Sequence, residues 1–301
     1  MDFPRSFSVV SDEIAQDLPT VVRFVREFRL GGFELRSLFG RAFKDLTERD
    51  LARVRAVIRD EGWRIHGCAS PVFKCPIDDR TAIREQLDVF KRSLEAAEVL
   101  GCDLARVFTF LRRRQPLNRP ATTQIAEHIS RLSEIAAGCG GVRIGVENEA
   151  SCMVATADEL VRLFRLLPQA NLGIVWDPCN ALYVLPPRQK ATRGYSALVP
   201  RIFHIHLKDA VRSRHPAAGS PAVSVPFGLG DVGWRAHLAE IRQSGYRGLL
   251  SLETHWRAFR LDDRLLHLPA GHAFSRGGAE ATRICLRNLE ALWRAAHDPL
   301  I

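Results

Sequence analysis

The sequence has no apolar segment long enough to cross a membrane. No uninterrupted apolar run in its 301 residues approaches the roughly 18 residues that a membrane-spanning helix needs. The first residues, MDFPRSFSVVSDE, contain neither the basic leader nor the apolar stretch of a secretory signal peptide. We therefore expect a cytoplasmic protein with no membrane partner.

The cysteines lack the spacing of a zinc site or of a redox motif. There are seven of them, an odd number, and no two form a CxxC pair. Scattered cysteines of this kind are typical of reduced thiols in a cytosolic protein. The sequence therefore indicates neither a disulfide framework nor a structural zinc finger.

Lysine is scarce in a chain that is nevertheless basic. The 43 lysines and arginines outnumber the 34 acidic residues, and the resulting net charge of +9 is of the kind that attracts polyanions. Only five of these 43 residues are lysine, and the arginines are spread along the chain, with 112–114 as the only tight cluster. We interpret the charge as an arginine-rich composition and expect no nucleic-acid partner.

A glycine-rich nucleotide-binding turn is also missing, and an alternating pattern stands in its place. No GxGxxG motif follows the first apolar run. Short β-branched runs predict eight strands, at 7–10, 33–36, 64–68, 104–108, 143–147, 172–176, 202–206 and 249–253. Between them, segments of helical period predict helices at 18–28, 49–60, 80–100, 122–137, 157–167, 192–198, 234–244 and 279–296. Thr156 and Glu159 have the spacing of a capping box at the fifth helix.

Eight strand-helix units predict a single-domain α/β fold, a (β/α)₈ TIM barrel over residues 1–301. Two longer segments, near 211–233 and 256–277, follow the seventh and eighth strands. Active sites of such barrels lie at the carboxyl ends of the strands. We therefore expect these two insertions to lie at the rim of the site.

Polar residues close the last four predicted strands. Glu147, Asp177 and Glu253 end the fifth, sixth and eighth strands, and the seventh carries His204 and His206. Because side chains alternate along a strand, all of these side chains can face the barrel interior together. The same alternation predicts that Phe203, like Ile205 and Leu207, faces the helices. Three carboxylates in one place would repel each other unless a cation neutralised them.

A divalent cation is therefore the simplest explanation of this cluster. Oxygen ligands with one imidazole favour Mn²⁺, Mg²⁺ or Co²⁺, and Zn²⁺ is also compatible. Residues two apart on a strand are separated by about 6.6 Å, so one ion with bonds of about 2.1 Å does not take both histidines. His206, nearer the rim, is the better ligand, and His204 either orients a carboxylate, contacts substrate or belongs to the core.

The sequence resembles the xylose isomerase-like TIM barrels, a family of sugar phosphate isomerases and epimerases that includes ketose 3-epimerases and inosose dehydratases. The resemblance covers essentially the whole chain and depends on five motifs, which are GVENE, WDPCN, HIHLKD, GLGDVGW and LSLETHW. It implies that Glu147, Asp177, His206 and Glu253 bind one divalent ion. It also implies that Glu147 and Glu253 are the catalytic acid and base, which move a proton through a metal-stabilised enediolate.

The chain departs from the free-ketose epimerases at two positions. Those enzymes have a histidine where this chain has Asn180, and an arginine after an HxGE segment where this chain reads HLKD. Both differences are at positions that contact the substrate. The resemblance therefore supports the metal chemistry more strongly than it supports a particular substrate. The related apurinic endonucleases have a histidine-rich, three-metal site, and this chain lacks their histidines after its fourth strand and in GDVGW.

Several further side chains are predicted to contact a carbohydrate substrate. They are His66, Asn180, His204, Lys208 and Trp256. His66, at the third strand, and Glu34, in the second, could equally be buried polar residues bonded to a neighbouring strand. Lys208 could bind a substrate oxygen or form a local ion pair with Asp209.

The predicted function is that of a metal-dependent isomerase or epimerase for a small sugar, polyol or sugar phosphate. Two alternatives stay open at this point. The same residues could expel water after taking the proton, which would make a dehydratase of the inosose type, or the barrel could bind a sugar without turnover. The oligomeric state is also open, and a homo-oligomer is among the states that the sequence allows.

Overall fold

Eight parallel strands form the centre of the molecule. The computed structural model describes residues 5–113, 117–213, 221–262, 265 and 271–296. The strands are β1 (Phe7–Val9), β2 (Gly32–Leu35), β5 (Arg64–Cys68), β6 (Leu104–Val107), β7 (Arg143–Glu147), β8 (Leu172–Trp176), β9 (Ile202–Leu207) and β12 (Leu249–Leu252). They pair in the order β1-β12-β9-β8-β7-β6-β5-β2, and a parallel bridge between Val10 and Glu34 joins the two ends of this sheet. The arrangement confirms the predicted (β/α)₈ barrel.

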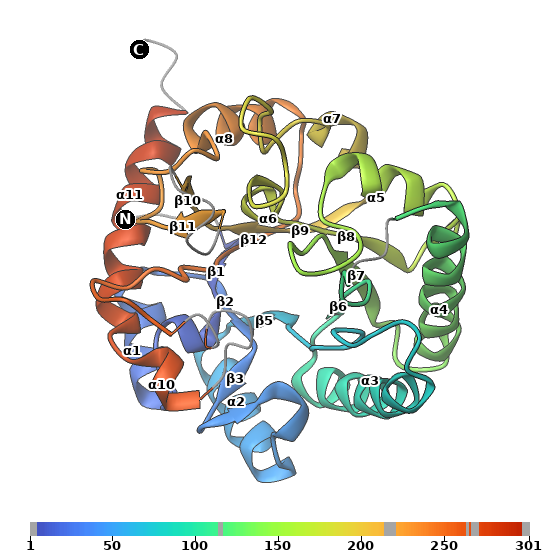
Figure 1. Ribbon diagram of the computed structural model, residues 1–301. Helices are drawn as coiled ribbons and strands as arrows, with labels where there is room; N and C mark the ends of the chain where they lie inside the picture. Colours follow the sequence, from blue (N-terminus) through green and yellow to red (C-terminus); the bar gives the residue numbers. More distant parts are fainter. Residues whose placement is uncertain (1–4, 114–116, 214–220, 263–264, 266–270, 297–301) are drawn as a thin grey trace.

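Helices surround this ring of strands (Figure 1). They are α1 (Leu18–Glu27), α2 (Glu48–Glu61), α3 (Arg80–Leu100), α4 (Arg119–Ala137), α5 (Ala157–Phe164), α6 (Pro178–Leu182), α7 (Tyr195–Leu198), α8 (Trp234–Gln243), α10 (Gly271–Ser275) and α11 (Gly278–Ala295). Three short 3-10 helices are η1 (Ser11–Glu13), η2 (Phe43–Asp45) and η3 (Val199–Arg201). The Thr156 hydroxyl accepts a hydrogen bond from the Glu159 backbone N–H, and the Glu159 carboxylate accepts one from the Thr156 backbone N–H, which confirms the predicted capping box.

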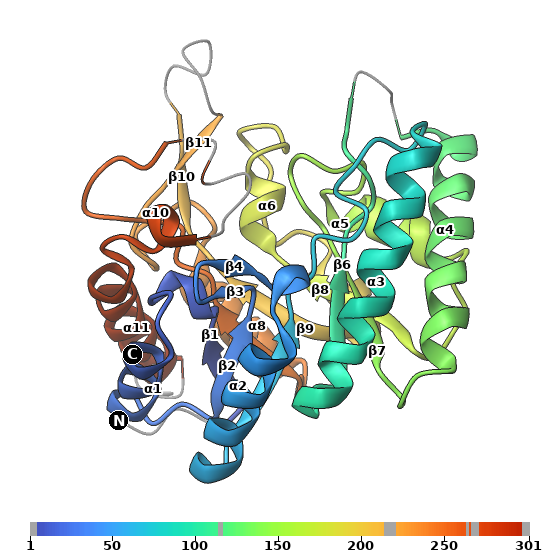
Figure 2. The same ribbon diagram turned by 90° about the horizontal axis from the view of Figure 1, so that it is seen from below.

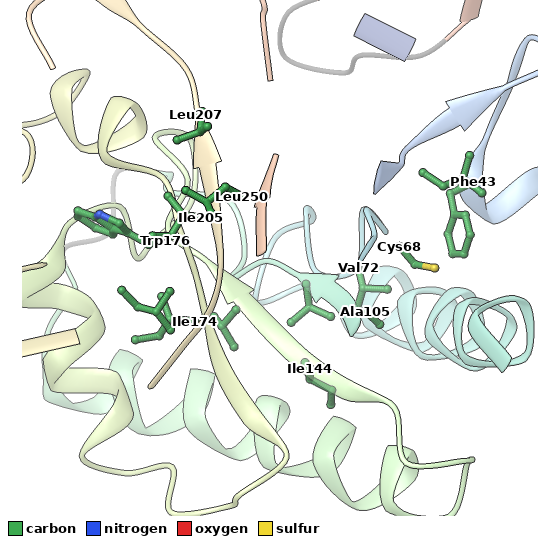
Figure 3. Close-up of a cluster of buried hydrophobic side chains, with 14 of the residues drawn as sticks. Phe43, Cys68, Val72, Ala105, Ile144, Ile174, Trp176, Ile205, Leu207 and Leu250 are labelled. Carbon is green, nitrogen blue, oxygen red and sulfur yellow. The ribbon is translucent and has the colours of Figure 1, made fainter. Parts of the chain in front are cut away.

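The apolar core lies between the strands and the helices. Trp176, Ile174 and Ile205 lie on β8 and β9 and are buried in this layer (Figure 3). The indole N–H of Trp176 donates to His237 of α8, which shows that Trp176 faces outward, as the alternation predicts. The opposite faces of the same strands are therefore left for the polar side chains of the barrel interior.

Phe203 does not follow the predicted alternation. Ile202 pairs with Ile174 and His204 pairs with Val175, so Phe203 is an extra residue at a bulge in β9. Its ring lies in the space that a Cβ on Gly173 would enter, and the Arg143 guanidinium lies 4.6 Å from the ring centroid. The prediction that Phe203 faces the helices is wrong, because a bulge shifts the side-chain order by one residue.

Additional elements stand at the end of the barrel where the strands finish. They are the hairpin of β3 (Ser37–Leu38) and β4 (Arg41–Ala42) and the hairpin of β10 (Ala210–Arg212) and β11 (Ala222–Ser224). Figure 2 shows the β10–β11 hairpin standing above the barrel beside α6. The predicted insertions near 211–233 and 256–277 thus contain β11 and α10, whereas 214–220, 263–264 and 266–270 lie outside the described residues.

The Asp209 carboxylate attaches the loop after β11 to the end of β9. It accepts backbone N–H bonds from Gly228 and Gly230, both at 2.9 Å. A Cβ on Gly230 would lie 2.1 Å from Asp209, so this close approach requires glycine. Among the residues that the structure describes, no helix is both long enough and apolar enough to cross a lipid bilayer.

Candidate metal and active site

The four predicted metal ligands converge at the carboxyl ends of their strands. One donor atom from each of Glu147, Asp177, His206 and Glu253 lies within 4.8 Å of every other, and all four side chains are buried. We call these four residues the ligand cluster. The Glu147 Oε1 atom is 3.3 Å from His206 Nδ1, which is 3.8 Å from Glu253 Oε2. The cluster forms because β7, β8, β9 and β12 are adjacent parallel strands, so their carboxyl ends meet at one end of the barrel.

Each glutamate of the cluster has an arginine on its outer oxygen. The Arg106 guanidinium donates to Glu147 Oε2 at 2.6 Å, and Arg36 donates to Glu253 Oε1. Burial would raise the pKa of Glu147, but Arg106 and His206 lower that pKa to about 2. Burial likewise opposes ionisation of Glu253, yet Lys208 with His255 and Arg36 holds its pKa well below the ordinary value. Both glutamates are therefore carboxylates at neutral pH, with one oxygen fixed by an arginine and the other turned toward the cluster.

Asp177 and His206 are likewise fixed through one polar atom, which leaves the other to face the ligand cluster. Asp177 Oδ1 accepts the Asn180 backbone N–H at 3.0 Å, at the start of α6, so Oδ2 faces the cluster. His206 Nε2 lies 3.1 Å from Glu34 Oε2, so Nδ1 faces the cluster. A carboxylate on the far nitrogen of a ligating histidine fixes the ring and makes the near nitrogen a better donor. Glu34 thus has a clear role in orienting His206.

His204 lies one layer deeper in the barrel. Its Nε2 atom is 2.7 Å from Ser251 Oγ and 3.3 Å from Glu34 Oε2, and Ser251 Oγ in turn is 2.7 Å from Ser8 Oγ. The rings of His204 and His206 are 5.2 Å apart between centroids. His204, His206 and Glu34 also form a group that could hold an ion. The Nε2 atoms of both imidazoles already lie against the Glu34 carboxylate, so we interpret this group as support for the ligand cluster.

Lys208 reaches into the ligand cluster itself. Its ammonium is 2.7 Å from Asp177 Oδ2, 2.9 Å from Glu253 Oε2 and 3.1 Å from Asn180 Oδ1. Burial opposes the charge on Lys208, but Asp177 and Glu253 hold its pKa well above the usual value. Asn180 also donates through its amide to Glu147 Oε1 at 3.2 Å. Both predicted substrate residues are therefore next to the ligands, and both have partners within the protein.

The other predicted substrate residues lie in different surroundings. Both ring nitrogens of the fully buried His66 lack a hydrogen-bond partner among the described residues, and burial lowers its pKa to about 3. Trp256 is half-buried and packs against the hydrophobic core. A substrate contact for either residue stays a prediction.

An ion-paired network adjoins the cluster on the side of β1. Glu13 contacts Arg36 at 2.8 Å and Arg257 at 3.0 Å, and all three side chains are buried. His255 has a positive φ of 48°, and its Nε2 atom lies 3.3 Å from Glu253 Oε1. Glu13, Glu253 and His255 could hold an ion by distance alone. The two guanidiniums already neutralise Glu13, so we interpret this group as a support for Glu253.

The residues of the ligand cluster fit a divalent cation. Three carboxylate oxygens and one imidazole nitrogen are the donors that Mn²⁺, Mg²⁺, Co²⁺ and Zn²⁺ accept in proteins. The protein fixes the outer atom of each ligand and directs the inner atom to one place, which is the arrangement that supporting residues give to a metal site. The donor atoms, their burial and the residues that support them are thus all consistent with a divalent cation.

Two arginines of the site were missed in the sequence analysis. Arg36 follows β2 and Arg106 lies in β6. Arg106 pairs in register with Gly145, two residues before Glu147, so its side chain faces the same interior. An arginine within a buried strand needs an acidic partner, because an unpaired buried charge is very costly. That argument could have identified Arg106 from the alternation alone.

The comparisons with known proteins agree with this fold. A family model described as the xylose isomerase-like TIM barrel matches residues 22–293. A 3-dehydroshikimate dehydratase of Pseudomonas aeruginosa is 30% identical over 184 residues, which is 60% of this chain. The matched segment is only 28% of the length of that curated relative.

Solved structures with low sequence identity share the fold. The structure of the IOLI protein with a zinc atom has a TM-score of 0.75 and 16% identity, and the match covers 96% of this chain and 98% of that one. A D-allulose 3-epimerase from Methylomonas sp., in complex with D-allulose, has a TM-score of 0.66 and 15% identity, with 96% and 99% covered. The chain therefore belongs to the xylose isomerase-like TIM barrel family, whose model matches most of its length.

Proposed function

We propose that the protein is a divalent-metal-dependent isomerase or epimerase that acts on a small sugar, polyol or sugar phosphate. The observation that carries this proposal is the ligand cluster, in which two glutamates, an aspartate and a histidine bring four donor atoms within 4.8 Å of each other. A membership in the family and the likeness to a sugar epimerase support it.

Glu147, Asp177, His206 and Glu253 would hold the metal. When bound, a divalent ion polarises a carbonyl and lowers the pKa of the neighbouring C–H. The oxygen-rich ligand set favours Mn²⁺, Mg²⁺ or Co²⁺, and the zinc-containing neighbour keeps Zn²⁺ among the candidates.

Glu147 and Glu253 would move the proton. They come from β7 and β12, which are separated in the sheet by β8 and β9, so they can approach a substrate carbon from two sides. Arg106 and Arg36 hold them as carboxylates, the form that a general base needs. One glutamate would take the proton from the carbon beside the carbonyl and release it to solvent. The other, which starts as a carboxylate, would deliver to the opposite face of that carbon a proton that it first takes up from solvent.

Lys208, Asn180 and Trp256 are the proposed substrate contacts nearest the barrel mouth, and His204 would orient Glu34. A lysine ammonium and an amide suit hydroxyl, carbonyl or phosphate oxygens. An indole suits the apolar face of a sugar ring.

The experiment is solvent-deuterium incorporation in a screen of ketoses, polyols and their phosphates with added Mn²⁺. We expect the Glu147→Gln and Glu253→Gln variants to lose exchange at the reacting carbon by a factor of about 10² or more. Glu149→Gln is the matched control, because Glu149 lies beside the site but pairs with Lys74. Unchanged exchange in either ligand variant would contradict the two-glutamate mechanism.

A dehydratase is the second candidate function, and one observation favours it. The curated relative with 30% identity is a 3-dehydroshikimate dehydratase. A dehydratase with these residues would take the same proton and then expel a hydroxyl group as water. Mass spectrometry of the product separates the two reactions, because dehydration removes the mass of one water and epimerisation leaves the mass unchanged.

A further inference from the structure

Lys208 contacts the same oxygen atoms that the proposed metal would use. Its ammonium lies 2.7 Å from Asp177 Oδ2 and 2.9 Å from Glu253 Oε2. The outer oxygens of these carboxylates are taken, by the Asn180 backbone N–H and by Arg36 respectively. The ammonium therefore does not support the ligands from behind, as the arginines do, but shares their inner side.

The burial of Lys208 and the position of its backbone restrict its ammonium to a few partners. Its side chain is 5% exposed, and its third contact is Asn180 Oδ1 at 3.1 Å. The backbone carbonyl of Lys208 accepts the indole N–H of the buried Trp234 at 2.7 Å, which fixes the start of the side chain. The ammonium is thus directed at the two carboxylates by the position of β9.

Protein cations already neutralise part of the negative charge of the cluster. Arg106 neutralises Glu147, and Lys208 lies between Asp177 and Glu253. A divalent ion that enters such a site gains less electrostatic free energy than it would among three unpaired carboxylates. The ammonium, which contacts two of the ligands, also repels the ion. Binding then requires the ammonium to give up at least one of its two carboxylate contacts.

We propose that Lys208 competes with the divalent cation for Asp177 Oδ2 and Glu253 Oε2 and so weakens metal binding. This inference depends on the proposed metal site. It goes beyond that site because a residue that is not one of the four ligands would lower the affinity for the metal.

The test is a titration of the purified full chain with Mn²⁺, followed by electron paramagnetic resonance of the free ion. We expect the neutral variants Lys208→Met and Lys208→Gln to bind Mn²⁺ at least about tenfold more tightly than the wild type. Lys208→Arg, which keeps the charge, stays close to the wild type. Lys74→Met is the matched control, because Lys74 lies near the site but pairs with Glu149.

A second readout does not depend on any substitution. The chain has only five lysines, so acylation of each one by a succinimide ester can be followed by mass spectrometry. We expect Mn²⁺ to increase the labelling rate of Lys208 relative to Lys74, because the ammonium loses a carboxylate contact.

If both neutral variants bind Mn²⁺ no more tightly than the wild type, the proposed competition by Lys208 is wrong, but the proposed metal site still stands. The same holds if Mn²⁺ does not change the relative labelling of Lys208. If the wild type and all variants fail to bind Mn²⁺, Mg²⁺, Co²⁺ or Zn²⁺, the proposed metal site itself is wrong and the inference is overturned with it.

Discussion

At the scale of single residues, the site depends on side chains that have two polar atoms, of which one contacts a supporting residue and the other faces the ligand cluster. His206 shows this most clearly, because Nε2 faces Glu34 while Nδ1 faces Glu147 and Glu253. His204 and His206 hold the pKa of Glu34 well below its ordinary value against the effect of burial, so Glu34 is a carboxylate that accepts from the ring. Burial opposes the charge on His206, but Glu34 and Glu147 hold its pKa well above the ordinary value, so both ring nitrogens carry protons. The proposed metal would displace the proton on Nδ1, while Glu34 keeps the one on Nε2.

This arrangement makes Glu34 a positioning residue for metal binding. We expect Glu34→Gln to weaken Mn²⁺ binding by about 10- to 100-fold, the usual cost of losing such a supporting carboxylate. The amide keeps the shape but lacks the charge that fixes the tautomer. Isothermal titration calorimetry with Mn²⁺ measures the change, and the half-buried Glu149, which lies outside this contact, provides the control variant Glu149→Gln. Wild-type affinity in Glu34→Gln would show that His206 does not need Glu34.

The sequence predicted the four ligands because each closes an apolar strand, and strand alternation turns them inward together. It did not predict how Arg36 and Arg106 pair with Glu253 and Glu147. The Arg36–Glu253 pair joins residues 217 positions apart, and only the closed barrel brings them together. The Arg106–Glu147 pair joins the neighbouring strands β6 and β7.

At the scale of the elements, a bulge decides which side chains fill the barrel floor. Phe203 is the extra residue of β9 and occupies the space beside Gly173, where an added Cβ would lie 2.3 Å from the ring. The absence of a side chain on Gly173 is what allows the ring to enter. The strand could not hold both side chains without a shift of the backbone.

The contact predicts a specific pair of stability effects. Gly173→Ala alone should destabilise the protein by about 1–3 kcal/mol, because the methyl group overpacks the site. Adding Phe203→Leu should recover part of that loss, so that the double variant is more stable than the sum of the two single variants predicts. Urea unfolding of the four proteins measures the coupling. Strictly additive effects would contradict the contact.

The regular elements were predictable because their signals are local. Eight strands and the long helices follow from apolar periodicity, and the capping box of α5 follows from Thr156 and Glu159. The β10–β11 hairpin was not predicted, because its register depends on contacts with Asp231 and α6 more than on its own sequence. The bulge at Phe203 was missed for the same reason, since only the pairing with β8 defines it.

At the scale of the whole molecule, part of the positive charge is internal. Arg36, Arg106, Arg257 and Lys208 are all buried and lie against acidic groups of the site. They are matched by at least as many buried carboxylates, so they neutralise the barrel interior and do not lower the positive charge of the surface.

The proposed metal site predicts that metal binding stabilises the barrel. It joins β7, β8, β9 and β12, and an ion bound only by the folded chain stabilises it by mass action. We expect Mn²⁺ at 100 times its dissociation constant to raise the free energy of unfolding by about 2.7 kcal/mol, and a chelator to remove the gain. Denaturant unfolding with Mn²⁺ or with chelator measures this, and the Asp177→Asn variant is the control that should respond less. An equal gain in that variant would place the ion elsewhere.

Buried neutral histidines predict how the whole fold responds to acid. Burial lowers the pKa of His66 to about 3, whereas a histidine in the unfolded chain titrates near 6.5. Below pH 6.5 the unfolded chain therefore binds a proton that folded His66 does not, so the stability that is complete above pH 6.5 is lost as the pH falls toward 3.

The variant His66→Leu removes this linkage and also the two unpartnered ring nitrogens. Between pH 6.5 and 4.5 we expect the wild type to lose about 2.3 kcal/mol more of its free energy of unfolding than the variant, because the slope rises from about 0.7 kcal/mol per pH unit at pH 6.5 to nearly 1.4 kcal/mol per pH unit at pH 4.5. Urea unfolding across this range measures the difference, in which the other titrating groups cancel. His128→Leu is the control, since the half-buried His128 has a smaller depression of its pKa from burial. Parallel pH dependences of the wild type and His66→Leu would mean that His66 is protonated in the folded protein as readily as in the unfolded chain.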